Sequence, residues 1–298
     1  MPPTINWSRT RRDLFLKCPR AWYLRYGHQS KSHASKVYSS SRQPWDLMLR
    51  AMKETLIERI EDLREGKEWS PLLVKHKLKY TLQKNIENSN HKVEELYLSA
   101  LLRYANNRLN MLWRCRIIQQ LVLKKHPCWY VLDRTESVST DARRIYASPD
   151  LAILIQKKWH LIRFDMQSAR RKDTDELEAN AMVFWAKQQG GFPQREVSYR
   201  LHTIGWRRGF WHTETFQPTS QSVQQSARLL ETDCRAMENM YRYGEFNLSL
   251  LPLAKSSKTC DSCSYRSRCP ASEGLLRAQQ EQKLLELAHC SNSSKTRG

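Results

Sequence analysis

Four cysteines are placed where their thiolates can form a metal centre. Three of them follow the pattern Cys260-x2-Cys263-x5-Cys269 near the C-terminal end of the sequence. The fourth ligand that such a centre needs can come from Cys18, near the other end, which is followed by Pro19. Thiolates bind zinc or an iron–sulfur cluster equally well by ligand type. A zinc ribbon more often shows two Cys-x-x-Cys pairs, and this chain has one.

Two aspartates form a second candidate site in the middle of the chain. Asp150 follows Pro149 and begins the apolar run 151–155, and Asp165 ends the run 161–164. Since side chains alternate along a strand, Asp165 and Gln167 share a face, and a hairpin between the runs brings Asp150 beside Asp165. Paired carboxylates attract Mg²⁺ or Mn²⁺, which can activate water at a phosphodiester. The alternative is that Asp150 occupies a turn and Asp165 the surface.

The elements that position these residues can be predicted from periodicity and from helix and turn signals. The first half is predicted to be helical and the second half to alternate between strands and helices. Helices are expected at 14–26, 45–65, 71–84, 93–125, 175–189, 219–243 and 273–289, and strands at 129–138, 143–156, 159–168, 196–204 and 209–216. The polar tail 291–298 is expected to be disordered.

The cysteine frame and the aspartates together resemble the PD-(D/E)XK nuclease superfamily, in its RecB- and AddB-type iron–sulfur exonuclease branch, which is similar to CRISPR adaptation exonucleases. The segment from Phe15 to Tyr23 resembles the opening helix with its first cluster cysteine, and Asp150, Asp165 and Gln167 resemble the catalytic motif. The resemblance implies a [4Fe–4S] cluster on Cys18, Cys260, Cys263 and Cys269, with Asp150 and Asp165 holding Mg²⁺ or Mn²⁺ and Gln167 positioning water or phosphate. Glu136 is expected on the preceding strand as an accessory ligand.

The resemblance also implies an α/β (α+β) fold with a restriction-endonuclease-like core, a mixed central sheet flanked by helices. One domain is expected over 1–290, with a helical insertion at 27–127, the sheet core at 128–217, the cysteine segment at 255–270 and chain ends joined at the cluster. Cys115, Cys128, Cys234 and Cys290 are expected to be buried or incidental thiols.

Three motifs depart from the family pattern. Gln167 stands where the family usually has Lys, and a neutral amide replaces a point charge there. Asn180-x-x-x-Phe184 is the best match to the helical Gln-x-x-x-Tyr motif. The segment 45–49 lacks the histidine that many members use as a metal ligand. These departures favour a weakened or inactive nuclease as the alternative to an active one.

A large positive charge predicts a polyanionic partner. The 298 residues include 50 Lys and Arg against 30 Asp and Glu, for a net charge of +20, which favours nucleic acid. The nuclease resemblance implies DNA rather than RNA. Phosphate contacts are expected from Arg170, Arg171 and Lys172, close to Asp165, and from Arg207 and Arg208, with Asn180 also expected to bind nucleic acid. Trp206 and Trp211 either stack on bases or pack in a hairpin.

The composition of the chain also bears on the cellular compartment of the protein. No segment approaches the ~20 apolar residues of a membrane span, and the first residues lack the apolar core of a signal peptide. A cytoplasmic protein is therefore expected, and there cysteines serve as thiols or metal ligands. The sequence thus predicts a Mg²⁺- or Mn²⁺-dependent nuclease acting on single-stranded DNA or duplex ends. The alternative is a weakened or inactive nuclease fold that binds nucleic acid within a larger complex, in which a helicase would be a separate chain.

Overall fold

The computed structural model describes most of the chain, and it is mixed α/β. The described residues are 5–27, 43–89, 92–123, 125, 128–140, 143–166, 172–261, 263–269, 271, 278–280 and 282–284, with only the backbone at 172–175. They fall into two compact units. Unit 1 lies within Met1–Ser40, Ser139–Arg144 and Leu229–Gly298, and unit 2 within Ser41–Val138 and Ile145–Arg228. Both ends of the chain therefore belong to the same unit.

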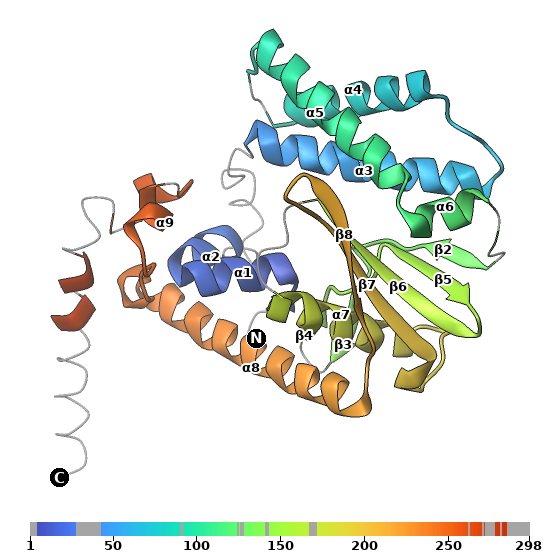
Figure 1. Cartoon of the computed structure of the whole chain (residues 1–298). Coiled ribbons are helices and arrows are strands. Elements are labelled where there is room, and N and C mark those ends of the chain that lie inside the picture. Colours follow the sequence, from blue (N-terminus) through green and yellow to red (C-terminus); the bar gives the residue numbers. More distant parts are fainter. Residues whose placement is uncertain are drawn as a thin grey trace. The chain divides into compact units, whose positions relative to one another are not determined.

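A five-stranded mixed sheet is the centre of unit 2 (Figure 1). Its spatial order is β2 (Trp129–Val131), β5 (Leu151–Ile155), β6 (Lys158–Asp165), β7 (Tyr199–Arg207) and β8 (Phe210–Phe216). The β6–β7 pair is parallel and the other pairs are antiparallel. A parallel pair needs a long crossover, and α7 (Lys172–Lys187) supplies it.

Helices cover both faces of this sheet (Figure 1). The first face packs on a hydrophobic core shared with the helices α3 (Pro44–Arg64), α4 (Pro71–Glu87), α5 (Glu95–Trp113) and α6 (Arg116–Val122). Ile162, Phe164 and Ile204 contribute the strand side of that core. Because side chains alternate, Arg163 and Asp165 face the other way, toward α7, where Arg163 meets Glu178.

Two stacked histidines interrupt the apolar face of the sheet. His160 Nδ1 and His202 Nε2 are 2.9 Å apart, and His202 Nδ1 lies 3.1 Å from Thr215 Oγ1. Both rings are buried. Burial, reinforced by the nearby His160 and Arg200, lowers the pKa of His202 to about 4. The folded protein therefore keeps this histidine neutral.

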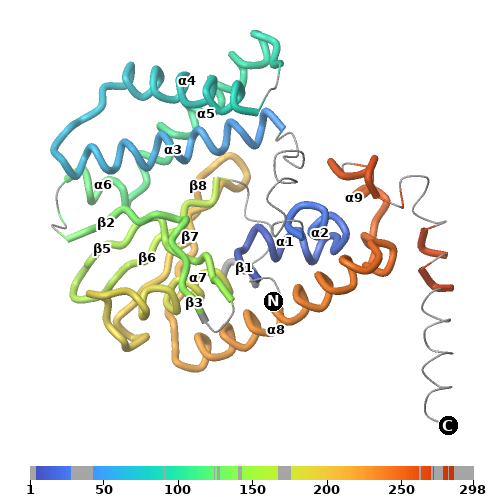
Figure 2. Tube along the Cα trace, turned by 180° about the vertical axis from the view of Figure 1, so that it is seen from behind, coloured from blue at the N-terminus to red at the C-terminus, as the bar shows by residue number. Residues whose placement is uncertain are grey.

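Unit 1 combines elements from the two ends of the chain with a short segment from its middle (Figure 2). Its elements are β1 (Ile5–Trp7), α1 (Arg9–Lys17), α2 (Pro19–Tyr26), most of β3 (Val138–Thr140) and β4 (Arg143–Ile145), the part of α8 (Ser220–Phe246) from Leu229 onward, and α9 (Ser257–Asp261). The strands form a sheet in the order β1-β4-β3. Asp233 of α8 accepts hydrogen bonds from Trp7 Nε1 and Arg12 Nε at 3.1 and 2.6 Å.

Two helices expected to be continuous are each divided. The helix expected at 14–26 is interrupted at Cys18, whose φ of −164° and ψ of 106° are extended. Pro19 explains this break, because proline disfavours the helical conformation of the residue before it. The helix expected at 93–125 ends at Trp113 and restarts at Arg116, with Cys115 extended. No glycine or proline marks that second break.

Several strand predictions were too long or misplaced. The strand expected at 129–138 is not continuous: it contains the three-residue strand β2 and, at its last residue, the start of β3. A turn joins these two strands, and in it Glu136 N–H donates to Asp133 O. Glu136 is thus an exposed loop residue, and its expected place on a strand is wrong. Gly205–Arg207, expected to separate two strands, continues β7 instead. The turn lies at Arg208 and Gly209, whose φ values of 47° and 88° suit a tight hairpin.

Three other expectations fall wholly or mostly outside the described residues. Cys290 and the tail 291–298 lie there completely. Of the helix expected at 273–289, only 278–280 and 282–284 are described, and they are helical. Within the part of the chain that is described, no helix combines the length and apolarity needed to cross a bilayer.

Candidate functional site: a carboxylate network and a four-cysteine pocket

The predicted hairpin between the two aspartate-bearing strands is present in unit 2. Leu151 pairs with Ile162 across the antiparallel β5–β6 ladder, and Asp150 N–H donates to Ile162 O at 2.9 Å. Asp150 immediately precedes β5 and is fully buried. Asp165 ends β6, where it pairs with Gly205 of β7, and it is partly buried.

The Asp150 carboxylate is surrounded by cations from three parts of unit 2. Its Oδ2 accepts hydrogen bonds from Lys53 Nζ and from the Phe164 backbone N–H, both at 2.7 Å. Its Oδ1 lies 3.4 Å from Arg163 Nη1 and 3.4 Å from Arg134 Nε. Lys53 also donates to Phe164 O at 3.1 Å, so its ammonium is bound at two points. Both carboxylate oxygens are therefore already engaged.

These cations keep the carboxylate ionised despite its burial. Burial by itself would raise the pKa of Asp150, but Lys53, Arg163 and Arg134 together outweigh it and hold that pKa well below its ordinary value. For Lys53 burial is the dominant effect, and it lowers the pKa of the ammonium in spite of Asp150. Asp150 and Lys53 thus form a buried ion pair, and its formation requires the desolvation of both charged groups.

Glu178 of α7 extends this network of charged side chains. Arg163 Nε lies 3.2 Å from Glu178 Oε1, and both side chains are almost fully buried. Arg134 also interacts electrostatically with Glu178 and Asp165. Its side chain is 47% exposed, against 15% for Lys53 and 3% for Arg163, so Arg134 is the most exposed of these three cations. Among the side chains that the structure describes, three cations thus face the carboxylates of Asp150, Asp165 and Glu178.

This donor set does not fit a divalent metal ion as it stands. Mg²⁺ requires oxygen ligands with free lone pairs, and cations already occupy both oxygens of Asp150. A doubly charged ion at Asp150 would also lie close to the positive charges of Lys53 and Arg163 in a buried region. Lys53 would have to leave before Asp150 could bind a metal.

Lys53 and Arg163 were not predicted as site residues, although the sequence pattern around each of them indicates a buried cation. Lys53 lies four residues after Leu49 and three before Leu56, both buried, so it occupies the apolar face of α3. Arg163 likewise interrupts an apolar strand. Buried cations are rarely left without a partner, so each of these positions pointed to a carboxylate elsewhere in the chain.

The remaining residues predicted for the carboxylate site are described only in part. Gln167, Arg170 and Arg171 lie outside the described residues, and Lys172 begins α7 with its side chain undescribed. Asn180 is 3% exposed, donates to Ser226 Oγ at 3.1 Å and accepts from Ser222 Oγ at 3.4 Å. These contacts favour a structural role for Asn180 between α7 and the start of α8.

The four predicted cysteines line one pocket in unit 1. A cavity of about 170 Å³ is bordered by Cys18, Cys260, Cys263 and Cys269. Its walls also include apolar side chains, such as Leu14 and Tyr265, and the cations Lys17, Arg25 and Arg266. Cys18 is buried and the other three thiols are partly buried. The positive side chains suit a group of net negative charge.

Local backbone geometry fixes two of the sulfur atoms. Cys18 caps α2, and its Sγ accepts from Ala21 N–H at 3.5 Å. Cys263 Sγ accepts from Tyr265 N–H at 3.4 Å. Burial, with the charges of the neighbouring cysteines adding to it, raises the pKa of Cys18 and of Cys260. Bound metal would reverse this effect, because coordination stabilises the thiolate.

Arg20 connects the N-terminal cysteine helix to the C-terminal segment. Its guanidinium is buried and donates from Nε to Leu251 O at 2.8 Å and from Nη2 to Ser249 O at 2.7 Å. These bonds join residues more than two hundred positions apart within unit 1. Arg20 thus holds α2 to the segment that leads into the other three cysteines.

The cysteine pocket brings four thiols to one cavity. Among the described residues, no three His, Cys, Asp or Glu side chains are gathered closely enough to bind a single ion. A zinc ion needs thiolates at about 2.3 Å from one point. The four thiols instead surround a cavity, and four cysteine thiolates are the donor set of a [4Fe–4S] cluster. The residues present therefore fit that group.

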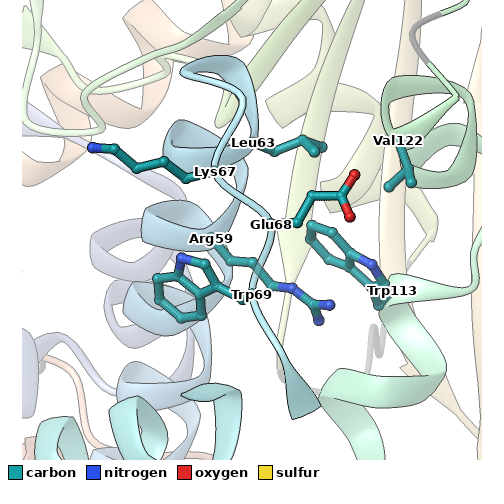
Figure 3. Close-up of a pocket in the computed structure, with 7 residues that line it drawn as sticks. All are labelled: Arg59, Leu63, Lys67, Glu68, Trp69, Trp113 and Val122. Carbon is teal, nitrogen blue, oxygen red and sulfur yellow. The ribbon is translucent and has the colours of Figure 1, made fainter. Parts of the chain in front are cut away.

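A smaller pocket in unit 2 lies beside Arg59 (Figure 3). The Arg59 guanidinium stacks 3.5 Å from the centre of the Trp113 ring, and Trp69 forms another wall. The cavity is about 70 Å³, and Glu68 also borders it. Arg59 Nε is buried without a hydrogen-bond partner among the described residues. A few water molecules would satisfy it, so this pocket needs no other ligand.

The chain matches no protein-family model and no curated protein sequence.

Proposed function

We propose that this protein binds nucleic acid through a nuclease-like fold of the PD-(D/E)XK type whose carboxylate site no longer uses a catalytic metal. The observation that supports this proposal is the network around Asp150, in which Lys53 and Arg163 take the place next to the carboxylate that a metal would need. Gln167, in place of the family's lysine, agrees with this reading. The excess of 20 positive charges supplies the attraction to a polyanion.

The same proposal assigns a [4Fe–4S] cluster to unit 1. Cys18, Cys260, Cys263 and Cys269 would hold it, and their shared cavity and cationic surroundings support the assignment. The cluster would stabilise unit 1 by connecting α2 to the C-terminal segment, next to the Arg20 hydrogen bonds. A role within a larger complex, with a helicase as a separate chain, is compatible with this function.

A binding and cleavage assay tests the function. The full-length protein, purified anaerobically, is titrated into labelled DNA and RNA at several salt concentrations, and each complex is also incubated with Mg²⁺ or Mn²⁺. We expect binding that weakens steeply with salt, because phosphate contacts release counterions. We also expect no cleavage beyond that of an Asp165→Ala control. Affinity independent of salt, or the absence of any binding, would contradict the proposal.

A metal-dependent nuclease is the second candidate. The position of Asp150 and Asp165 at the ends of two neighbouring strands favours it. In that case wild-type protein would cut DNA with Mn²⁺ while Asp165→Ala would not. A Gln167→Lys variant is informative as well. If Lys53 blocks the metal, Gln167→Lys remains inactive, whereas cleavage by Gln167→Lys alone would show that the aspartates bind metal despite Lys53.

A further inference from the structure

Tyr265 places a buried hydroxyl in the wall of the cysteine pocket of unit 1. It borders the same cavity as the four cysteines and is 6% exposed. Its ring belongs to the small hydrophobic core that includes Cys18, against which Cys260 and Cys263 also pack. Of the residues that border this cavity, Tyr265 is the one whose buried side-chain oxygen has no hydrogen-bond partner within the described part of the chain.

An unpaired phenol is an unfavourable group to bury. A buried donor without an acceptor pays its full desolvation energy, so each such group in a folded protein calls for an explanation. Two other buried tyrosines show the usual arrangement: Tyr199 OH donates to Pro193 O at 2.5 Å, and Tyr241 OH donates to Glu245 Oε1 at 2.9 Å. Tyrosine at position 265 is therefore favourable only if a group bound in the cavity supplies an acceptor.

The backbone holds Tyr265 beside the cysteine sulfurs. Its own N–H donates to Cys263 Sγ at 3.4 Å, and its carbonyl oxygen accepts from Arg268 N–H at 3.1 Å. Arg266 N–H donates to Cys263 O, and Cys269 N–H donates to Arg266 O, both at 3.2 Å. Tyr265 thus lies in a hydrogen-bonded turn between two of the predicted cluster ligands, and this turn fixes where the side chain begins.

The sulfur atoms of an iron–sulfur cluster have the chemistry that this hydroxyl lacks. Sulfide and thiolate sulfurs carry negative charge and accept hydrogen bonds, and a phenol can donate one. Hydrogen bonds to charged acceptors are stronger than those between neutral groups, so such a contact can offset the burial of the hydroxyl. Lys17, Arg25 and Arg266 border the same cavity and favour a negatively charged occupant.

We propose that Tyr265 binds the cluster by donating a hydrogen bond from its hydroxyl to one of the cluster sulfurs. This inference rests on the proposed function, and it adds a redox property to a cluster that the proposed function treats as structural. Hydrogen bonds to the sulfurs help to set the reduction potential of such clusters. A donor stabilises the reduced form more than the oxidised form, because the reduced form carries one more negative charge. Tyr265 therefore raises the reduction potential.

A redox titration of full-length protein tests this role. Wild type and Tyr265→Phe are purified anaerobically, and the reduced cluster is followed by electron paramagnetic resonance as the potential is varied. Both should contain the same amount of iron and sulfide, because all four cysteines remain. We expect Tyr265→Phe to favour the reduced form about tenfold less, which is a downward shift of about 59 mV for a one-electron couple.

Tyr243→Phe is the matched control. Tyr243 also belongs to unit 1, but it is 52% exposed and does not border the cavity. Its substitution should leave the reduction potential and the iron content at the wild-type values. Thermal unfolding of both variants checks that the fold is intact.

A second measurement detects the hydroxyl proton itself. Electron–nuclear double resonance of the reduced cluster is compared for protein in H₂O and in D₂O, which reveals the exchangeable protons close to the sulfurs. The N–H groups of Ala21 and Tyr265 donate to cysteine sulfurs and should contribute in both proteins. Tyr265→Phe should lack one further exchangeable proton that the wild type shows.

The outcomes separate this inference from the proposed function. If wild-type protein holds a cluster and Tyr265→Phe keeps both its potential and its exchangeable protons, the role of Tyr265 is wrong and the proposed function stands. Equal shifts in Tyr265→Phe and Tyr243→Phe would also overturn the role, since the exposed hydroxyl lies outside the pocket. If wild-type protein contains zinc or no metal, the proposed cluster itself fails.

Discussion

The Lys53 ammonium lies 2.7 Å from Asp150 Oδ2 and joins a helix to the start of a strand 97 residues away. The contact places a protein cation against the carboxylate that the sequence motif assigns to metal binding. A buried ion pair of this kind contributes little net stability compared with an apolar pair, but removing one partner is costly. The contact therefore constrains both the stability of unit 2 and the chemistry of its site.

Replacing Lys53 should destabilise the fold by leaving Asp150 buried without its closest cation. We expect Lys53→Met to lower the free energy of unfolding by about 3 kcal/mol, measured by urea denaturation. Arg50→Met is the control, because Arg50 pairs with Glu54 on the exposed surface of the same helix. That change should cost less than about 1 kcal/mol.

The same variant should create a metal site at the carboxylates. Without the ammonium, Asp150 Oδ2 loses a hydrogen bond and part of its charge compensation. We expect Mn²⁺ to bind Lys53→Met more tightly than the wild type, measured by isothermal titration calorimetry. Asp150→Asn combined with Lys53→Met should remove that binding. Equal Mn²⁺ affinity of wild type and Lys53→Met would show that Lys53 does not occupy the metal position.

The buried histidine pair should make stability depend on pH. The pKa of His202 is about 4 in the folded protein, below its ordinary value of 6.5. The unfolded chain therefore binds more protons between these values, and stability falls as the pH is lowered from about 6.5 to about 4. Urea midpoints across this range measure the effect.

Substitution of one histidine isolates its contribution. His202→Gln removes the titrating ring and should flatten the pH dependence in that window. His212→Gln, which removes an exposed histidine from β8, should leave the slope as it is in the wild type. A wild-type slope in the His202→Gln protein would assign the dependence to other groups.

Loss of one cluster ligand should be visible in the absorption spectrum. Anaerobically purified wild-type protein should be brown and contain iron and sulfide, and Cys18→Ser should lose most of both. Cys128→Ser is the matched control, since Cys128 belongs to unit 2 and should leave the iron content unchanged. Colourless wild-type protein with stoichiometric zinc would overturn the cluster assignment.

Arg20 should be needed for the integrity of the cysteine pocket. Arg20→Lys keeps the charge but cannot donate two hydrogen bonds in a fixed fork to Leu251 O and Ser249 O. We expect a loss of about 2 kcal/mol in the free energy of unfolding, measured by denaturation. Arg25→Lys is the control, because Arg25 lies on the same helix at an exposed position. Equal losses in the two variants would argue against this role for Arg20.

The sequence predicted the parts of this protein that depend on local patterns. Alternating and apolar runs located β5 and β6 with Asp150 and Asp165 at their ends, and proline marked the starts of α3 and α4. Pro19 also provides a local signal for the break at Cys18, because proline restricts the conformation of the preceding residue. The break at Cys115 had no comparable local signal.

Local patterns could not predict which charged residues contact one another in the folded protein. Lys53 meets Asp150, and Arg163 meets Glu178, through the packing of helices on a sheet. Such contacts depend on tertiary structure, so a single sequence shows only that a cation occupies an apolar face. The orientation of the β7–β8 hairpin could not be predicted either, because it depends on the position of the turn. Moving the turn to Arg208–Gly209 decides which face carries Phe210.

The composition of unit 1 has a consequence for how the protein folds. Trp7 and Arg20 find their partners at Asp233 and Leu251, which are separated from them by 226 and 231 positions. During synthesis, the N-terminal helices cannot form these contacts until most of the chain has been made. Unit 2 ends at Arg228, so all of its residues are synthesised before Asp233 and Leu251. Because the loop to be closed is so long, the docking of the N-terminal helices onto the C-terminal segment is expected to be the slow, last step of folding.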